Sequence, residues 1–323
     1  MNQIETKNVN FRKIISKYSI ILILIIIMVM CTIADSNFLT VNNLLNVCRQ
    51  QSVTIIVALG EMALIICGAL DLSAGSVIAF SGVLSVMSYK ATGSMLLAFA
   101  VAILISLFIN FLNGIMVTKF KAPAFIATLA TQMIARGAAL YITNGQNVYE
   151  IGDYTVVGQG SLGPVPIPVV FMLVIFLIVA YLMHHTRWGR STYAVGGNAE
   201  AANASGINTN MVIMKAYLLH GVLVGIAAVL FMSRVNGGLP AGADGYEMDA
   251  LTATIVGGTS FTGGIGTPWG TVVGAFVVGF LSNIMNLMTI DSYIQQMVRG
   301  AIIAVAVIWD IYSKSRNTYR KGK

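Results

Sequence analysis

Long apolar runs separated by short polar segments make up most of the chain. The first run covers residues 18–33 and contains Ile-Leu-Ile-Leu-Ile-Ile-Ile at 21–27. After a polar link at 35–50, further runs cover 51–69, 73–89, 94–117, 124–142, 166–184, 211–235, 249–265, 268–289 and 293–311. About 20 apolar residues in a helix cross the hydrocarbon core of a bilayer. The pattern therefore predicts an all-α, polytopic integral membrane protein with about ten transmembrane helices, some short or broken.

The segment before the first run, residues 1–17, is polar and basic. A basic start followed by an apolar run is also typical of a secretory signal peptide. However, no pair of small residues makes a convincing cleavage site, and Met30 does not fit a lipoprotein-type site at Cys31. We therefore expect an uncleaved first span behind a cytoplasmic tail, within a single membrane domain over residues 18–311.

Basic residues between the runs set the expected orientation, because cytoplasmic loops carry an excess of Lys and Arg. With the N-terminus inside, the alternation of spans places on the cytoplasmic side Lys119, Lys121, Arg187, Arg190, Lys314, Arg316, Arg320, Lys321 and Lys323. Both termini are then cytoplasmic, with a cytoplasmic loop at 185–210 and a basic tail at 312–323. The longest external segment, 143–167, is expected to be an ordered cap that meets an extracellular partner.

The composition agrees with a membrane protein and argues against other classes. Hydrophobic residues make up 57% of the 323 residues and charged residues only 10%, whereas soluble domains carry roughly 25% charged residues. Orientation in the bilayer explains the net charge of +7, so no nucleic acid partner is expected. The three cysteines, Cys31, Cys48 and Cys67, lack metal or redox spacing and are expected to be unpaired.

Signals for an enzyme are weak. The sequence has no Gly-x-x-x-x-Gly-Lys-Ser/Thr loop for nucleotide phosphates. His184 and His185 point in different directions on a helix and His220 is isolated, so no metal site is expected. We predict that the chain is not an enzyme and holds no cofactor.

The polar island between the runs ending at 184 and starting at 211 predicts a short helix outside the membrane. Asn198 is suited to accept the free amides at a helix start, Glu200 lies in the first turn, and Gly206 ends the helix. Because so short a helix is marginal alone in water, we expect it to pack against a cytoplasmic partner, although a simple connecting loop is the alternative. The residues assigned to this contact are Gly197, Asn198, Glu200, Ala201, Ala202, Ser205 and Gly206.

Two glycine-rich stretches, residues 68–76 and 257–270, interrupt the helical pattern at the expected membrane depth. Irregular backbone is tolerated there only beside protein or a water-filled cavity, so both are expected against a central pathway. Paired breaks mark inverted repeats in many transporters, but these two have the same expected orientation. The pathway or structural candidates are Asp71, Ser73, Gly75, Gly257, Gly258, Thr259, Gly263, Gly264 and Gly266.

Placing a charged side chain within a membrane span costs free energy, so such residues suggest a function. The candidates are Glu61, Asp71, Arg136, Asp249 and Arg299. Asp71 begins an Asp-x-Ser pattern, so we favour a helix cap over a transport group, while the two arginines are expected to pair with carboxylates or helix-end carbonyls. An ion-coupled secondary carrier would need one of the carboxylates, and it remains the alternative function. The acidic residues at 244, 247 and 249 suggest either a weak cation site or, more simply, a solvated loop.

Four segments together resemble one family. They are Gly196-Gly-Asn-Ala-Glu-Ala-Ala-Asn-Ala-Ser-Gly-Ile207, Ala241-Gly-Ala-Asp-Gly-Tyr-Glu-Met-Asp-Ala250, Gly257-Gly-Thr-Ser-Phe-Thr-Gly-Gly-Ile-Gly-Thr267 and Asp71-Leu-Ser-Ala-Gly-Ser76. Over about residues 40–311, and in matching order along the chain, they resemble the membrane subunits of bacterial ABC importers for simple sugars, the ribose, galactose and xylose permeases. The sequence departs from the family at Ala74, where Val is usual, and at Glu61, where an uncharged residue is usual.

The resemblance implies a permease in the bacterial cytoplasmic membrane, paired with a second permease subunit of the same or another kind. It implies a separate ATPase that contacts the Glu200-Ala-Ala-x-x-x-Gly206 segment, and an extracytoplasmic sugar-binding protein that delivers the substrate. ATP hydrolysis then belongs to the partner chain. The sugar itself is not implied, because the family carries pentoses, hexoses and a furanosyl signalling molecule.

Overall fold

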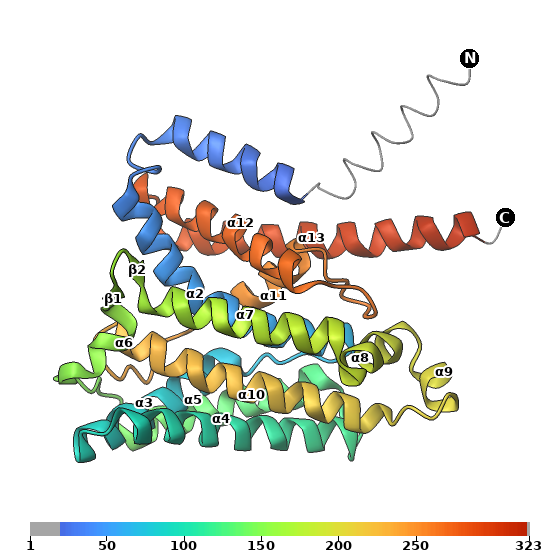
Figure 1. Ribbon diagram of the computed structural model, residues 1–323, viewed down its shortest axis with the longest axis horizontal. Coiled ribbons are helices and arrows are strands. Elements are labelled where there is room, and N and C mark those ends of the chain that lie inside the picture. Colours follow the sequence, from blue (N-terminus) through green and yellow to red (C-terminus); the bar gives the residue numbers. More distant parts are fainter. Residues whose placement is uncertain (1–19, 322–323) are drawn as a thin grey trace.

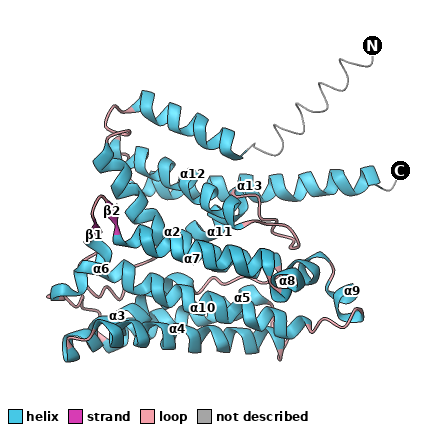
Figure 2. Ribbon diagram, in the orientation of Figure 1, coloured by secondary structure: helices cyan, strands magenta, loops and turns pink. Residues whose placement is uncertain are grey.

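The computed structural model describes residues 20–321, almost all in helices (Figures 1 and 2). The long elements are the helix Ile20–Ala34, α2 (Val41–Ile66), α3 (Ala74–Thr92), α4 (Met95–Thr118), α5 (Ala124–Ile142), α7 (Ile167–His185), α8 (Arg187–Gly197), α10 (Thr209–Arg234), α11 (Tyr246–Val256), α12 (Pro268–Leu287) and α13 (Ser292–Lys321). The short ones are η1 (Gly152–Thr155), α6 (Val156–Gln159), the antiparallel pair β1 (Ser161–Leu162) and β2 (Val165–Pro166), and α9 (Ala199–Ala204). The predicted all-α membrane class is confirmed.

Eight helices are long and apolar enough to cross a membrane: α2, α3, α4, α5, α7, α10, α12 and α13. The first expected span is described only from Ile20, and the 1–17 tail lies outside the described residues. The expected span at 249–265 is wrong, because α11 ends at Val256 and a loop follows. Gly258, Gly263 and Gly264 take positive φ angles of 85°, 84° and 76° in that loop, which residues with a Cβ rarely adopt.

Two further boundaries differ from expectation. Most of the expected polar link at 35–50 is the first part of α2, because Leu44 and Val47 give it an apolar face against Phe280 and Ile284 of α12. The expected tail from 312 continues α13 as far as Lys321.

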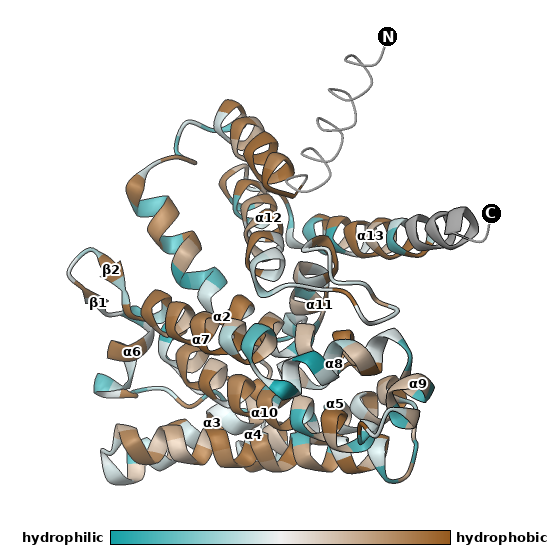
Figure 3. Cartoon of the chain, turned by 45° about the vertical axis from the view of Figure 1, so that its right-hand side comes forward, coloured by the Kyte–Doolittle hydropathy of each residue, from teal (hydrophilic) through white to brown (hydrophobic). Residues whose placement is uncertain are grey.

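The centre of the molecule is formed by α2 and α10. In their apolar windows 89% and 78% of the residues are buried, against 6% in α13. α10 packs along α4, while α2 contacts α7, α10, α11 and α12. Hydrophobic residues colour most of α4 and α7 in Figure 3, as expected for helices that face lipid.

Apart from α11, the short elements between the long helices gather at two opposite ends (Figure 1). α8 and α9 lie at one end, named here the α8 end. η1, α6, β1 and β2 lie at the other, named the hairpin end. The helix Ile20–Ala34 begins and α13 finishes toward the α8 end.

The segment 143–167 is ordered at the hairpin end. Gly158 N–H donates to Ser233 Oγ at 2.6 Å, and Ser233 Oγ donates to the Tyr154 carbonyl at 2.6 Å. Lys90 Nζ donates to the Tyr149 carbonyl at 2.7 Å. These bonds tie the segment to α10 and α3.

Candidate functional site

α8 was not expected as a helix, since its polar sequence contains three glycines and aromatic residues but no long apolar run. Its buried positions, Gly189, Thr192 and Val195, recur every three residues and therefore share one face. Trp188 Nε1 donates to the Val212 carbonyl of α10 at 3.2 Å. These contacts hold α8 against the ends of the spans.

α9 follows α8 and is almost wholly exposed. Asn198 Oδ1 accepts the Ala201 N–H at 2.9 Å, which confirms the predicted cap, and Glu200 lies in the first turn. Gly206, with φ of 84°, ends the helix as predicted. Its N–H donates to the Asn203 carbonyl, a bond typical of a glycine-terminated helix.

One side chain of α9 is buried, and the rest face outward. Ala202 is 6% exposed and packs with Ile207 against the ends of α2 and α10. Gly197, Ala201 and Ser205 are exposed, as are Asn198, Glu200 and Gly206. The predicted contact residues thus form a free surface, except for Ala202, which anchors the helix to the membrane domain.

The C-terminal end of α8 touches the end of α2, just before the first predicted break, and the second predicted break at one point, named here the α8 junction. The Gly264 N–H donates to the Ile66 carbonyl at 2.9 Å, which joins the α11–α12 loop to the end of α2. Gly196 lies against the same atoms, so that a Cβ at this position would overlap the Ile66 carbonyl oxygen. Tyr193 OH donates to the Gly266 carbonyl at 2.9 Å, and burial raises the pKa of Tyr193, which keeps it a donor.

The remaining loop candidates have structural partners near the α8 junction. Gly257 and Gly270 pack so closely that a Cβ on either would overlap the backbone of the other, which brings α11 onto α12. Thr259 is 1% exposed, while Gly258 is exposed. A Cβ on Gly263 would lie 2.9 Å from the Gly196 carbonyl oxygen, so it too belongs to the junction.

The first break, residues 67–73, is surrounded by polar side chains from three helices. Tyr217 OH of α10 donates to the Leu70 carbonyl at 2.9 Å, and the Leu72 N–H donates to Thr128 Oγ1 of α5 at 3.1 Å. Asn113 Nδ2 of α4 donates to Ser73 Oγ at 3.1 Å. Irregular backbone inside the protein is thus satisfied internally, as a membrane requires.

Asp71 accepts the Ser73 N–H on Oδ1 at 2.7 Å, so it supports the start of α3 as predicted, although Ser73 holds the N-cap position. Its other oxygen, Oδ2, lies 3.6 Å from His220 Nε2. Glu61 Oε2 lies 3.8 Å from the same nitrogen, and Glu61 Oε1 accepts the Asp71 N–H at 3.2 Å. All three side chains are almost fully buried, so two carboxyl groups share one imidazole inside the protein.

The other intramembrane charges also have partners. Arg136 Nη1 donates to the Pro240 and Gly242 carbonyls at 2.9 and 2.7 Å, and Arg299 Nη1 lies 3.5 Å from Asp249 Oδ2. Arg299 therefore pairs with a carboxylate as predicted, whereas Arg136 pairs with carbonyls of the loop before α11 and not with a carboxylate or helix-end carbonyls.

The acidic residues at 244, 247 and 249 do not form one cluster. Glu247 is 4% exposed and accepts Gln132 Nε2 at 3.2 Å, whereas Asp244 is exposed. The solvated-loop interpretation is wrong for Glu247, because it packs against Gly75 at the start of α3, where a Cβ would overlap its carboxylate.

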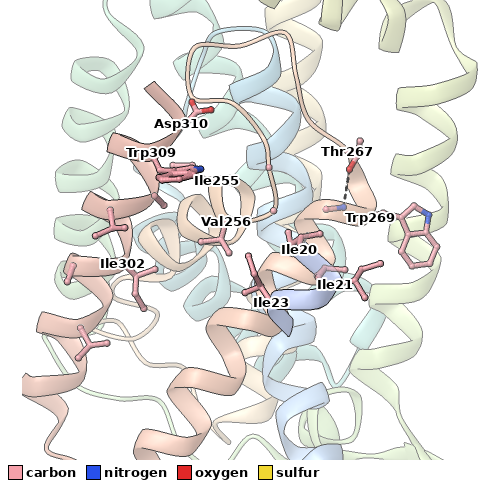
Figure 4. A pocket seen from close by; sticks show the side chains of 18 residues that line it. Ile20, Ile21, Ile23, Ile255, Val256, Thr267, Trp269, Ile302, Trp309 and Asp310 are labelled. Atoms are coloured by element: carbon pink, nitrogen blue, oxygen red, sulfur yellow. Dashed lines mark hydrogen bonds between the residues drawn. The ribbon is translucent and has the colours of Figure 1, made fainter. Parts of the chain in front are cut away.

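A large groove of about 1180 Å³ lies between the helix Ile20–Ala34, α11, α12 and α13 (Figure 4). Its lining is mostly apolar, with Ile20, Ile302 and Trp309 among the labelled residues. Its two side-chain acceptors are engaged: Thr267 Oγ1 accepts the Gly270 N–H, and Asp310 Oδ2 accepts the Phe261 N–H. The groove suits hydrocarbon and offers little to a polar solute.

Among the polar residues that sequence analysis missed are His220 and Tyr193. The partners of each are 73 or more positions away in the chain. A lone polar residue within an apolar run was the one available signal for His220. The cysteines Cys31, Cys48 and Cys67 are free, as predicted.

Comparison with known proteins places these features in context. Residues 43–307 match the family described as branched-chain amino acid transport system / permease component. The ribose import permease protein RbsC of Escherichia coli (strain K12) is 38% identical over 297 residues, 90% of this chain and 92% of the relative. The D-allose transport system permease protein AlsC of the same strain is 33% identical over 309 residues, 95% of each chain.

A third relative is the L-arabinose transport system permease protein AraH of Escherichia coli (strain K12). It is 32% identical over 306 residues, which cover 94% of this chain and 93% of the relative. No solved structure matches the chain significantly.

Proposed function

Because the chain belongs to this family of transport-system permease components, we propose that it forms the membrane pathway of an ATP-driven importer for a simple sugar. The permease family is a transport component and not an enzyme, so ATP is hydrolysed on a separate chain and this chain needs no cofactor. The named relatives handle ribose, allose and arabinose, which supports a neutral pentose or hexose as the substrate.

The observation that carries the mechanism is the path from α9 to the α8 junction. α9 presents an exposed surface around Glu200, while α8 contacts the end of α2 and the second break through Gly196. A partner ATPase bound at α9 and closing on ATP would therefore displace α8 and, with it, the Ile66 and Gly264 backbones. Such a rigid-body shift between packed helices is a common way to open a pathway alternately to the two sides of a membrane.

We further propose the sidedness and the remaining partners. The α8 end faces the cytoplasm, which puts both ends of the chain inside and agrees with the basic residues near α8. The hairpin end then faces outward, where the ordered 143–167 segment exposes Tyr149 and Leu162 to a sugar-binding protein. A second permease subunit completes the pathway in the bacterial cytoplasmic membrane.

The first experiment is mild-detergent purification of the tagged chain from its native host, with quantification of co-purifying proteins. A stoichiometric ATPase and a binding protein are expected. The purified complex in liposomes should then take up labelled D-ribose, D-allose or L-arabinose only when ATP is inside.

Two controls test the alternatives. Labelled L-leucine replaces the sugar, because the family description names branched-chain amino acids. An imposed sodium or proton gradient replaces ATP. Uptake of leucine but no sugar would overturn the substrate class, and gradient-driven uptake by this chain alone would overturn the ATP-driven mechanism.

A further inference from the structure

A second cavity, of about 210 Å³, lies toward the hairpin end where α2, α10, α11, α12 and α13 meet. Its polar lining includes Gln51, Thr54, Arg234, Tyr246, Asp249 and Arg299. This chemistry is opposite to that of the apolar groove beside α13. Pockets for drug-sized ligands occupy roughly 300–1,000 Å³, so this one suits a smaller molecule.

The charges around the cavity balance. Two arginines, Arg234 and Arg299, face two aspartates, Asp244 and Asp249, so the formal charges of these four groups sum to zero. Arg299 pairs with Asp249 at 3.5 Å, and Arg234 Nη2 donates to Tyr246 OH at 3.0 Å. A site of this kind favours a neutral polar ligand over an ionic one, because the formal charges of its own side chains already cancel.

Several buried polar atoms on this lining have no hydrogen-bond partner among the described residues. Gln51 is 6% exposed, and its Oε1 has no hydrogen-bond partner among the described residues. Arg234 Nε and Arg299 Nε are likewise buried and unpartnered within the described range. Leaving a buried polar group unpaired is unfavourable, so a molecule carrying both donors and acceptors would be bound here.

The cavity also offers rigid apolar surface. Phe231 lines it and meets Tyr246 edge-to-face at 5.2 Å, so both rings are held in place. Gly279 of α12 fixes the Gln51 side chain, since a Cβ at Gly279 would overlap the amide. Fixed aromatic carbon beside amide, hydroxyl and guanidinium groups matches a sugar ring, which has C–H faces and a rim of hydroxyls.

We propose that this cavity binds one neutral monosaccharide on the hairpin side of the pathway, with Gln51, Arg234 and Arg299 as its hydrogen-bonding residues. The proposal rests on the proposed function and adds the place of binding. Sugar entering from the hairpin end meets this site before it reaches the breaks at the α8 end.

The main test compares two glutamine variants in the ATP-driven liposome assay. Gln51→Leu removes the amide while keeping most of the volume, and Gln296→Leu makes the same change on the exposed part of α13 outside the cavity. For Gln51→Leu we expect the half-saturating D-ribose concentration to rise about tenfold, the effect of losing one buried hydrogen bond. Gln296→Leu should match the unaltered protein.

A second measurement does not depend on transport. Ser282 lines the cavity and is 7% exposed, so Ser282→Cys is made in a variant whose three native cysteines are replaced by serine. Saturating D-ribose should slow labelling of the introduced thiol by a methanethiosulfonate reagent at least threefold, and Gln51→Leu should remove this protection. Ribose 5-phosphate, which is charged, should not protect.

The outcomes separate the two proposals. Normal ATP-driven sugar uptake without protection of the introduced thiol, or with an unchanged half-saturating concentration in Gln51→Leu, would show a water-filled cavity only and overturn this inference alone. If the unaltered complex takes up no sugar, the proposed function fails and the sugar site fails with it.

Discussion

At the α8 end the closest contacts are between backbones, whereas at the hairpin end side-chain hydrogen bonds are added to backbone contacts such as the Val148–Gly238 bridge. Gly196, Gly264 and the Ile66 carbonyl approach each other with no room for a Cβ. At the hairpin end, Ser233 and Lys90 hold the ordered segment by hydrogen bonds, and Arg299 pairs with Asp249 around a cavity. Close backbone contacts transmit a displacement, because packed interiors deform little, while side chains rearrange around a solute. The difference suggests that one end transmits force and the other selects the solute.

The largest effect on sugar uptake is expected for Gly196→Ala at the α8 junction. Its Cβ would overlap the Ile66 carbonyl oxygen, and backbone atoms cannot rotate away as a side chain does. We expect sugar uptake to fall to background while the protein still inserts into the membrane. The matched control is Gly137→Ala in α5, because nothing lies within 4 Å of a Cβ at that position. Equal uptake by both variants would remove the junction from the mechanism.

The next largest effect is expected for Glu200→Lys on α9. The side chain is exposed at the start of the helix, where reversing its charge costs the helix about 0.3–1 kcal/mol, too little to unfold the membrane domain. Uptake should fall at least tenfold, with loss of the co-purifying ATPase on gels. Glu200→Gln keeps the shape and should retain more activity. Full recovery of the ATPase with Glu200→Lys would argue that α9 is only a connecting loop.

A moderate effect is expected for Asp71→Asn. The amide oxygen still accepts the Ser73 N–H, so the start of α3 is kept, but the charge facing His220 is lost. We expect uptake to fall severalfold at normal protein levels, and Asp71→Leu, which loses both interactions, to accumulate poorly. Complete loss of uptake in a stable Asp71→Asn protein would instead assign an essential charge to Asp71 and favour ion coupling.

The smallest effect is expected for Ser233→Ala at the hairpin end. It removes the hydroxyl that accepts the Gly158 N–H and donates to Tyr154, at a cost of about 1–3 kcal/mol. The apparent melting temperature in detergent should drop by a few degrees with uptake retained. Ser191→Ala serves as the control, because its hydroxyl donates a solvent-exposed bond to the Arg187 carbonyl of the same helix, and it should leave the melting temperature unchanged. A large loss of uptake would show that the hairpin end also transmits force.

The long helices were predictable because each is an apolar run of sufficient length. α5 covers 124–142 as expected, and α7 and α12 start within one residue of expectation. α8 and α11 were not predicted correctly, because a polar or glycine-flanked helix of 11 residues gives no long apolar signal. The cap at Asn198 and the stop at Gly206 were predictable, since both depend on neighbours in the chain.

The class of the protein and most of its spans follow from the sequence alone. The reason is that the length and apolar content of each run depend only on residues that are neighbours in the chain. The sequence also predicted the kind of partner that Arg299 has. Only the tertiary structure decided that His220 lies between Glu61 and Asp71, that Gly196 touches Ile66, and that Gln51 faces the arginines of a polar cavity. Those contacts join distant segments, and they depend on which faces of α2, α10 and α12 pack together, which no single run of residues specifies.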